Sequence, residues 1–169
     1  MVGGAAEMAG IWLKISIANQ RATLMRDAMP LRGWPVSTAK NGAGEQNNSG
    51  CTPRGWHRIR AKIGGDQPAA AVFIGRRPTG EVHSAELHQS SAGRDWILSR
   101  ILWLCGEEAG KNRGGNVDSQ RRYIYIHGTP DQYPLGQPLS QGCVRMANTD
   151  VIELFNQVAA GTRVLITEQ

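Results

Sequence analysis

The amino-acid sequence predicts a mainly β domain with two helices. Short β-rich runs separated by turn residues dominate the chain, and only two segments place their apolar residues at helical spacing. The length of 169 residues suits one domain, and a hydrophobic fraction of 40% is enough for one ordinary core. We therefore expect a flexible N-terminus at residues 1–10 and one folded domain at residues 11–169.

The predicted strands are short and rich in β-branched and aromatic residues. The first three are close together and form an antiparallel meander. The Gly-, Asn- and Ser-rich segment at 40–50 (KNGAGEQNNSG) follows as a surface loop. The predicted strands are Ile11–Ile17, Arg21–Arg26, Leu31–Ser37, Trp56–Ile63, Ala70–Ile74, Arg122–Ile126 and Arg163–Ile166.

Two segments show the spacing of an amphipathic helix. Residues 95–105 (DWILSRILWLC) place tryptophan, isoleucine and leucine side chains three and four positions apart, and Gly106 follows as a stop signal. A second helix is predicted to begin at Asn148 or Thr149 and to end near Ala159. Both helices are expected to pack on the strands through their apolar sides.

The chain is basic, with 19 Lys and Arg residues against 14 Asp and Glu residues and a formal net charge of +5. The basic residues cluster at Arg54–Lys62, Arg76–Arg77 and Arg121–Arg122. These clusters are short, lack interleaved aromatic residues and match no nucleic-acid module, so no nucleic-acid partner is expected. A solvated basic face is the simplest interpretation, and a site for a carboxylate-rich ligand is the alternative.

The cysteines and the N-terminus indicate a reducing compartment. Cys51, Cys105 and Cys143 are odd in number and form no CxxC pair, which argues against a disulfide framework and a four-thiolate zinc site. The first residues lack a basic region, and no apolar run approaches the length of a membrane span. We expect a cytoplasmic protein with no membrane insertion, or a periplasmic one if the N-terminus is truncated.

The stretch at 126–146 (IHGTPDQYPLGQPLSQGCVRM) holds the residues suited to nucleophilic catalysis. His127 ends a strand, and Cys143 follows Gly142 after a Gly- and Pro-rich loop. A nucleophilic thiol needs a nearby base and backbone N–H groups aimed at the developing oxyanion, and nearby positive charge lowers the thiol pKa. Arg145 and His127 are therefore expected to lower the pKa of Cys143. From the residues alone, a structural thiol and a strand-end histidine fit equally well.

This stretch closely resembles the L,D-transpeptidase catalytic domain family (YkuD-like), which carries a His, a loop and then Ser/Thr-His-Gly-Cys-x-Arg/Asn. Here His127-Gly128-Thr129 opens the motif, and Ser140-Gln141-Gly142-Cys143-Val144-Arg145 closes it. Upstream, Val36-Ser37-Thr38-Ala39 is similar to the family's V-S-T-G, and Thr52–His57 is similar to its T-P-x-G-x-[FY] segment. The order of the blocks agrees over residues 11–167, nearly the whole chain.

The resemblance implies a β-sandwich domain and a cysteine acyl-transfer reaction. Cys143 would attack the carbonyl between diaminopimelate and D-Ala in a peptidoglycan stem tetrapeptide and form a thioester. His127 would take the thiol proton, and the backbone carbonyl of Gly128 would orient the imidazole. No cofactor and no metal are implied, and His83 and His88 are five positions apart rather than at the spacing of HExxH metalloproteases.

The resemblance also implies roles for the residues around the thiol. The amides of Gly142 and Cys143 would line the oxyanion hole, Ser140 would support the loop, and Arg145 would hold the substrate or the loop. Gln141 departs from the family's histidine and cannot titrate, so any acid–base role at that position is in doubt. The candidate substrate-binding and oxyanion residues are Gly142, Ser140, Arg145, Gln141 and Thr129.

The expected location decides the expected acceptor. A cytoplasmic enzyme meets soluble muropeptides and water, which favours an L,D-carboxypeptidase of murein recycling that acts on peptidoglycan stem peptides or muropeptides. A cross-linking or amino-acid-exchanging L,D-transpeptidase is the first alternative. A non-catalytic peptidoglycan-binding domain, suggested by Gln141, is the second. The sequence gives no oligomeric state.

Overall fold

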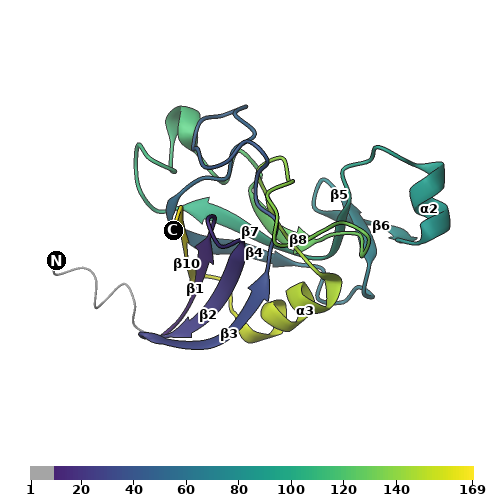
Figure 1. The fold of residues 1–169 in the computed structure, drawn as a ribbon, viewed down its shortest axis with the longest axis horizontal. Coiled ribbons are helices and arrows are strands. Elements are labelled where there is room, and N and C mark those ends of the chain that lie inside the picture. Colours follow the sequence, from purple (N-terminus) through teal and green to yellow (C-terminus); the bar gives the residue numbers. More distant parts are fainter. Residues whose placement is uncertain (1–9) are drawn as a thin grey trace.

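The computed structural model describes residues 10–169. The flexible N-terminus predicted at residues 1–10 lies outside the described residues except for Gly10, so that expectation stays a prediction. The described chain is mainly β with two α-helices, which confirms the predicted fold class (Figure 1).

The strands join in one mixed sheet. Its order is β3-β2-β1-β10-β4-β7-β5-β6, and β8 pairs with β7 and with β9. Most neighbours are antiparallel, but β1 and β10 are parallel, as are β8 and β9. The strands are β1 (Ile11–Ser16), β2 (Arg21–Arg26), β3 (Met29–Pro35), β4 (Gly55–Ile63), β5 (Ala71–Ile74), β6 (Arg77–Val82), β7 (Ile97–Gly106), β8 (Tyr125–Gly128), β9 (Val144–Met146) and β10 (Arg163–Thr167).

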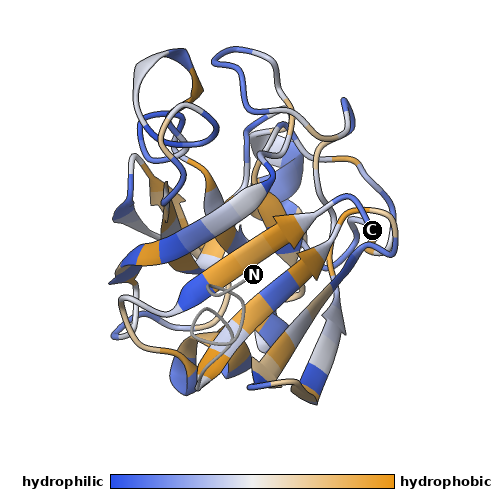
Figure 2. Ribbon diagram, turned by 90° about the vertical axis from the view of Figure 1, so that its left-hand side faces the viewer, coloured by the Kyte–Doolittle hydropathy of each residue, from blue (hydrophilic) through white to orange (hydrophobic). Residues whose placement is uncertain are grey.

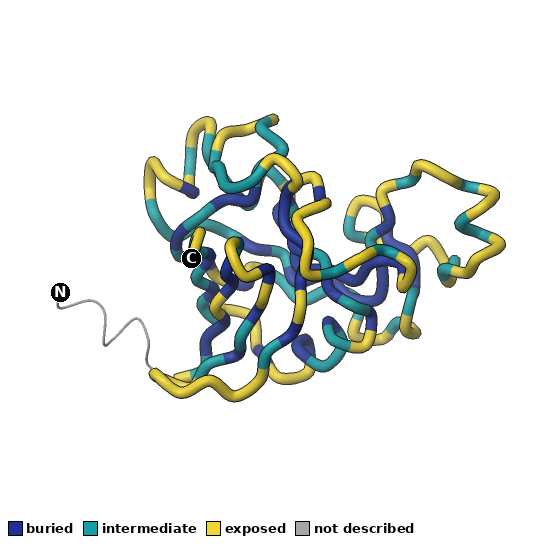
Figure 3. Tube along the Cα trace, viewed as in Figure 1, coloured by how far each residue is buried: buried dark blue, intermediate teal, exposed yellow. Residues whose placement is uncertain are grey.

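The main core lies between one face of the sheet and the helix α3 (Asn148–Gln157). Val151 and Leu154 of this helix are fully buried against strand residues such as Ile126 and Val144. Alternating residues on the strands account for the striped colouring of the sheet in Figure 2, and the buried residues gather at the centre of the molecule in Figure 3. Burial of each such side chain contributes about 1.5–3 kcal/mol of hydrophobic free energy. This core holds β8 and β9 in place through the side chains on one of their faces.

The helix predicted at residues 95–105 is wrong, because the segment forms strand β7. β7 pairs with β4, β5 and β8, so it is a central strand. The consecutive residues 98–102 are all buried, so both faces of the strand are covered. A strand buried on both faces has a near-continuous apolar sequence, and periodicity alone does not separate it from a buried helix. Trp103 is only partly buried and packs against a smaller core cluster that contains Phe73 and Tyr125.

The helices differ from the prediction in position and in capping. A helix that the sequence did not predict, α2 (Ala85–Ser90), begins after Ser84, whose side chain accepts a hydrogen bond from the Leu87 N–H. The second predicted helix is present as α3, but Ala147 precedes it and no side chain caps it. The 3-10 helix η1 spans Gly115–Val117. No described helix is long and apolar enough to cross a membrane.

Candidate active site

The parallel strands β8 and β9 place the two residues of the predicted catalytic pair on one face of the sheet. Ile126 pairs with Val144, and both point into the core. The next pair, His127 and Arg145, therefore points to the opposite face, because side chains alternate along a strand. Cys143 shares that face, being two positions before Arg145. The sulfur of Cys143 lies 3.3 Å from the backbone nitrogen of Tyr125, two positions before His127 on β8.

This face of the sheet forms the wall of a pocket of about 510 Å³. Cys143 and His127 both line it, and Cys143 is partly exposed rather than sealed in the core. The pocket is lined by Gly75, Arg76, Asp95, Ile97, Arg122, Tyr123, Tyr125, His127, Ser140, Gln141, Cys143 and Arg145. Of the eight candidate site residues, the structure brings five to this one pocket.

The imidazole of His127 is held in one tautomer. Its Nδ1 lies 2.6 Å from the carbonyl oxygen of Gly128, and because that oxygen can only accept, Nδ1 carries the proton. The other ring nitrogen, Nε2, is left with its lone pair. Burial lowers the pKa of His127, and the bond to Gly128 opposes this in part. The ring is therefore neutral at neutral pH, which is the form that a general base requires.

The thiol of Cys143 is also neutral. Burial raises the pKa of Cys143 to about 12, although a hydrogen bond from the Tyr125 N–H and the charges of Arg145 and Arg122 act to lower it. The sulfur lies 3.3 Å from the Tyr125 nitrogen and 3.3 Å from the Tyr123 carbonyl oxygen. The charge of Arg145 lowers this pKa as expected, His127 is not among the groups that shift it, and desolvation outweighs the charges, so the pKa is raised.

Ser140 organises the loop that carries the thiol. Its hydroxyl donates to the carbonyl of Cys143 at 2.6 Å and accepts from the amide of Gly142 at 3.2 Å. Gly142 has a backbone φ of 132°, a conformation that residues other than glycine rarely adopt. The Gly142 amide already has a hydrogen-bond partner. The Cys143 amide, the other predicted oxyanion-hole donor, has no acceptor among the described residues.

The two upstream sequence blocks hold this loop in place. Ser37 exchanges backbone hydrogen bonds with Arg145, both at 2.9 Å. Thr52 donates its hydroxyl to the carbonyl of Gly142 at 2.9 Å and accepts from the amide of Ala39 at 2.9 Å. The blocks that carry the resemblance therefore meet in space, although about 90 positions separate Thr52 from Gly142.

Three of the candidate residues, Gly128, Thr129 and Gln141, do not lie at the centre of the pocket. Gly128 lies where a Cβ atom would approach Asn148 Oδ1 to 2.5 Å, so only glycine fits. Thr129 is buried behind the pocket, and its hydroxyl has no hydrogen-bond partner among the described residues. Gln141 is exposed and lies at the rim.

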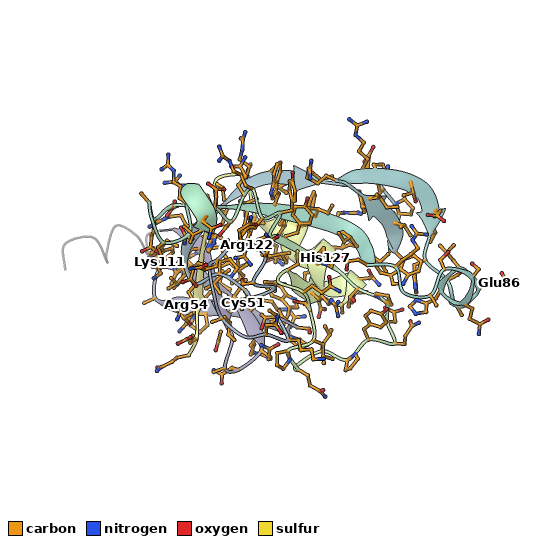
Figure 4. The ribbon with its side chains drawn as sticks, turned by 90° about the horizontal axis from the view of Figure 1, so that it is seen from above. Cys51, Arg54, Glu86, Lys111, Arg122 and His127 are labelled. Carbon is orange, nitrogen blue, oxygen red and sulfur yellow. The ribbon has the colours of Figure 1, made fainter. Side chains whose placement is uncertain are left out.

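A second cavity of about 540 Å³ lies on the other side of the thiol. It shares Arg122, Ser140, Gln141 and Cys143 with the first pocket, and the loop at 41–50 forms its outer wall. Arg122 stabilises that loop by donating to the carbonyl of Cys51 at 2.6 Å. In the view of Figure 4, Arg122 lies next to Cys51, and His127 lies to the right of both.

Sequence reasoning did not select Arg76, Asp95 or Arg122 as site residues, although all three line the pocket. For the two arginines, the only sequence signal was that each belongs to a short basic cluster. A solvated basic face explains such clusters equally well. His83 and His88 bond to each other at 2.9 Å and pack on Trp96, away from the thiol.

Known proteins resemble this chain in sequence and in fold. The model of the L,D-transpeptidase catalytic domain matches residues 10–166. YqjB of Bacillus subtilis (strain 168), named as an L,D-transpeptidase, is 49% identical over 47 residues, which cover 28% of this chain and 27% of that protein. YkuD of the same organism, also named as an L,D-transpeptidase, is 35% identical over 85 residues, 47% of this chain and 46% of that protein. The matched part thus spans less than half the length of these relatives.

Solved structures agree in fold. An L,D-transpeptidase from Mycobacterium smegmatis has a TM-score of 0.54 at 17% identity, covering 94% of this chain and 59% of that one. The C442S mutant of an Enterococcus faecium L,D-transpeptidase has a TM-score of 0.57 at 14% identity, covering 95% and 50%. With a family match over nearly all of its residues, this chain belongs to the L,D-transpeptidase catalytic domain family of peptidoglycan-modifying enzymes.

Proposed function

We propose that this chain is a cysteine acyltransferase that acts on the L,D bond between diaminopimelate and D-Ala in peptidoglycan stem tetrapeptides. The observation that carries this proposal is the pairing of a partly exposed thiol with a neutral imidazole in one pocket, the imidazole having its Nδ1–H fixed by Gly128. Family membership supports the choice of substrate, since the relatives are named as L,D-transpeptidases.

The first half-reaction forms a thioester on Cys143. The sulfur attacks the scissile carbonyl while Nε2 of His127 takes the thiol proton, so that charge develops only as the bond forms. The Cys143 amide donates to the resulting oxyanion. The imidazolium then gives its proton to the leaving amine of D-Ala, which departs as a neutral amino group, and the acyl group stays on the sulfur.

Water or an amine can complete the second half-reaction. Attack by water releases a tripeptide and makes the enzyme an L,D-carboxypeptidase, the outcome suited to soluble muropeptides in the cytoplasm. Attack by an amine makes it a transpeptidase. The second cavity, which borders Cys143 and is lined by Lys40, Asn41 and Asn47, supports an amine acceptor as the second candidate. In either case His127 takes the proton from the acceptor.

A tetrapeptide muropeptide, incubated with the protein with and without a D-amino acid, separates these outcomes by mass spectrometry. Loss of D-Ala in water alone supports the carboxypeptidase, and exchange or dimer formation supports the transpeptidase. No change in either reaction, with peptide binding retained, supports a non-catalytic binding domain and contradicts the proposal. The matched control is Cys143→Ala, which is expected to remove both reactions.

A further inference from the structure

The pocket around Cys143 carries an excess of positive charge. Arg76, Arg122 and Arg145 line it, and Asp95 is the one carboxylate among its described lining residues. Within residues 10–169, none of these three arginines forms an ion pair, whereas five other arginines pair with glutamates. Unpaired guanidinium groups around one cavity favour an anionic ligand.

Arg76 differs from the other two because it comes from a separate part of the fold. It lies at the tip of the β5–β6 hairpin, where Gly75 and Arg76 have φ values of 55° and 66°. Two successive residues with positive φ form the tight turn that joins adjacent antiparallel strands. This hairpin extends from the end of the sheet beside α2 (Figure 1), and the turn brings the Arg76 side chain to the pocket.

The guanidinium of Arg76 is held rigidly. Its central carbon lies 4.7 Å from the ring centroid of Trp103 and 4.9 Å from that of Tyr123, and Nη1 donates to the Tyr125 hydroxyl at 2.9 Å. One of five N–H groups is used in that bond. Since stacking on aromatic rings fixes the plane of the group, the remaining N–H groups have a defined direction and little entropy to lose when they bind an anion.

Arg76 and Arg145 reach the pocket from different elements and rest on different aromatic rings. Trp103 pairs with Tyr125 across β7 and β8, and Tyr125 lies one position before the Ile126–Val144 pair, next to Cys143. Tyr125 spans the space between the two groups, because its N–H lies 3.3 Å from the sulfur and its hydroxyl lies 2.9 Å from Nη1 of Arg76. Arg145 is two residues after Cys143 in the chain, and the central carbon of its guanidinium lies 5.6 Å from the ring centroid of Tyr133.

We infer that Arg76 is a specificity-determining residue that binds the side-chain carboxylate of the amino acid that supplies the scissile carbonyl. This inference rests on the proposed function. A diamino dicarboxylic acid such as diaminopimelate carries its distal carboxylate on a long side chain, which suits Arg76, a group separated from the thiol by the length of Tyr125. The carboxylate of the leaving D-Ala is only one residue from the scissile bond, which suits Arg145, two residues after Cys143 in the chain.

The test compares two tetrapeptides that differ only in whether the side-chain carboxylate of the diamino acid is free or amidated. Binding to the Cys143→Ala protein is measured by titration calorimetry, so that turnover does not interfere. We expect roughly tenfold tighter binding of the free acid, the size of one charge-assisted hydrogen bond. Arg76→Gln in the same background is expected to reduce the preference to within about twofold by weakening the free acid alone.

The matched control is Arg77→Gln, the next residue of the hairpin, which is exposed and does not line the pocket. It is expected to keep the full preference. Arg76→Lys keeps the charge but loses the planar stack, and it is expected to keep part of the preference. If Arg76→Gln weakens both peptides equally, Arg76 only docks the hairpin and the inference is wrong.

A preference that is missing at the outset, or that survives in Arg76→Gln, overturns the inference as well, as does failure of both peptides to bind. Turnover by the protein with Cys143 intact is measured separately with the same peptides. A binding preference without turnover leaves the assignment of Arg76 in place and contradicts the proposed acyl transfer. Turnover without a preference does the reverse.

Discussion

Two buried histidines of this protein make the same kind of contact through Nδ1 but differ in the surroundings of Nε2. His57 on β4 and His127 on β8 each place Nδ1 against a backbone carbonyl, that of Gly55 at 3.0 Å and that of Gly128 at 2.6 Å. Nε2 of His57 bonds the hydroxyl of Ser119 at 2.8 Å. Nε2 of His127 has no partner among the described residues, and its ring lines the pocket of the thiol.

The difference separates a structural histidine from a candidate base. Burial lowers the pKa of both rings, that of His57 to about 4. Burial and a depressed pKa therefore do not identify a catalytic residue on their own. The distinguishing feature is an unengaged lone pair beside a nucleophile, in a cavity that a substrate can enter.

Replacing cysteines beside the two histidines gives the largest expected effect. Cys143→Ala is expected to lower kcat/KM for tetrapeptide cleavage by on the order of 10⁴-fold or more, because the nucleophile is lost. Cys105 lies opposite Arg58, the neighbour of His57, and burial raises its pKa. Cys105→Ala is expected to leave kcat/KM within about twofold. Steady-state kinetics on both variants checks this, and equal losses would remove the distinction between the two regions.

Replacing each histidine by glutamine sharpens the comparison further. His127→Gln is expected to lower kcat roughly 10²- to 10⁴-fold with little change in stability, since a general base is lost. His57→Gln is expected to leave kcat unchanged and to lower the free energy of unfolding by about 1–3 kcal/mol, since a buried hydrogen-bond network is broken. Kinetics and urea unfolding measure the two effects. A loss of kcat in His57→Gln that exceeds its loss of folded protein would contradict the assignment.

The His57 ring also predicts a pH dependence of stability. Its folded pKa of about 4 lies below the unfolded value of 6.5, so the unfolded state binds the extra proton first as the pH falls. The protein is expected to lose roughly 3 kcal/mol from this group between pH 6.5 and pH 4. Urea unfolding across this range measures the loss. His57→Gln supplies the control, and an unchanged pH dependence in this variant would show that other groups cause it.

Backbone strain beside the thiol is expected to affect stability about as much as the loss of the His57 side chain. In Gly142→Ala, the residue keeps a φ of 132° and its new Cβ lies 3.3 Å from the Cys51 carbonyl oxygen. We expect a cost of about 1–3 kcal/mol, with slower acylation because the Cys143 amide shifts. Gly136→Ala in the same loop has a φ of 82° and no atom within 4 Å of its Cβ. It is expected to keep its acylation rate in rapid-quench kinetics, and equal rates in both variants would contradict this account.

The sequence predicted the residues that carry the pocket's chemistry but not all the residues that line the pocket. His127, Ser140 and Cys143 lie on one stretch whose pattern indicates a thiol, a base and a supporting loop. Arg76 reaches the same pocket only through the β5–β6 turn and the stacking on Trp103. Contacts between residues so far apart in the sequence have no local pattern. The burial that raises the Cys143 pKa likewise depends on tertiary packing.

The strand β7 shows the same limit for secondary structure. Its register shifts between Leu98 and Ile101, where Ser99 has a φ of 70°. This irregularity breaks the simple alternation of a strand and leaves apolar residues at helical spacing. Strands β2 and β10 alternate regularly in burial, and the positions of β1, β2 and β10 were confirmed within a few residues.

The thioester on Cys143 is the central claim, and intact-protein mass spectrometry tests it most directly. The protein is mixed with a stem tetrapeptide, quenched in acid within the first turnover and digested to locate any adduct. The account predicts a tripeptidyl group on Cys143, formed more slowly in His127→Gln. An adduct on Cys51 or Cys105 instead, or release of D-Ala by the Cys143→Ala protein, would contradict it.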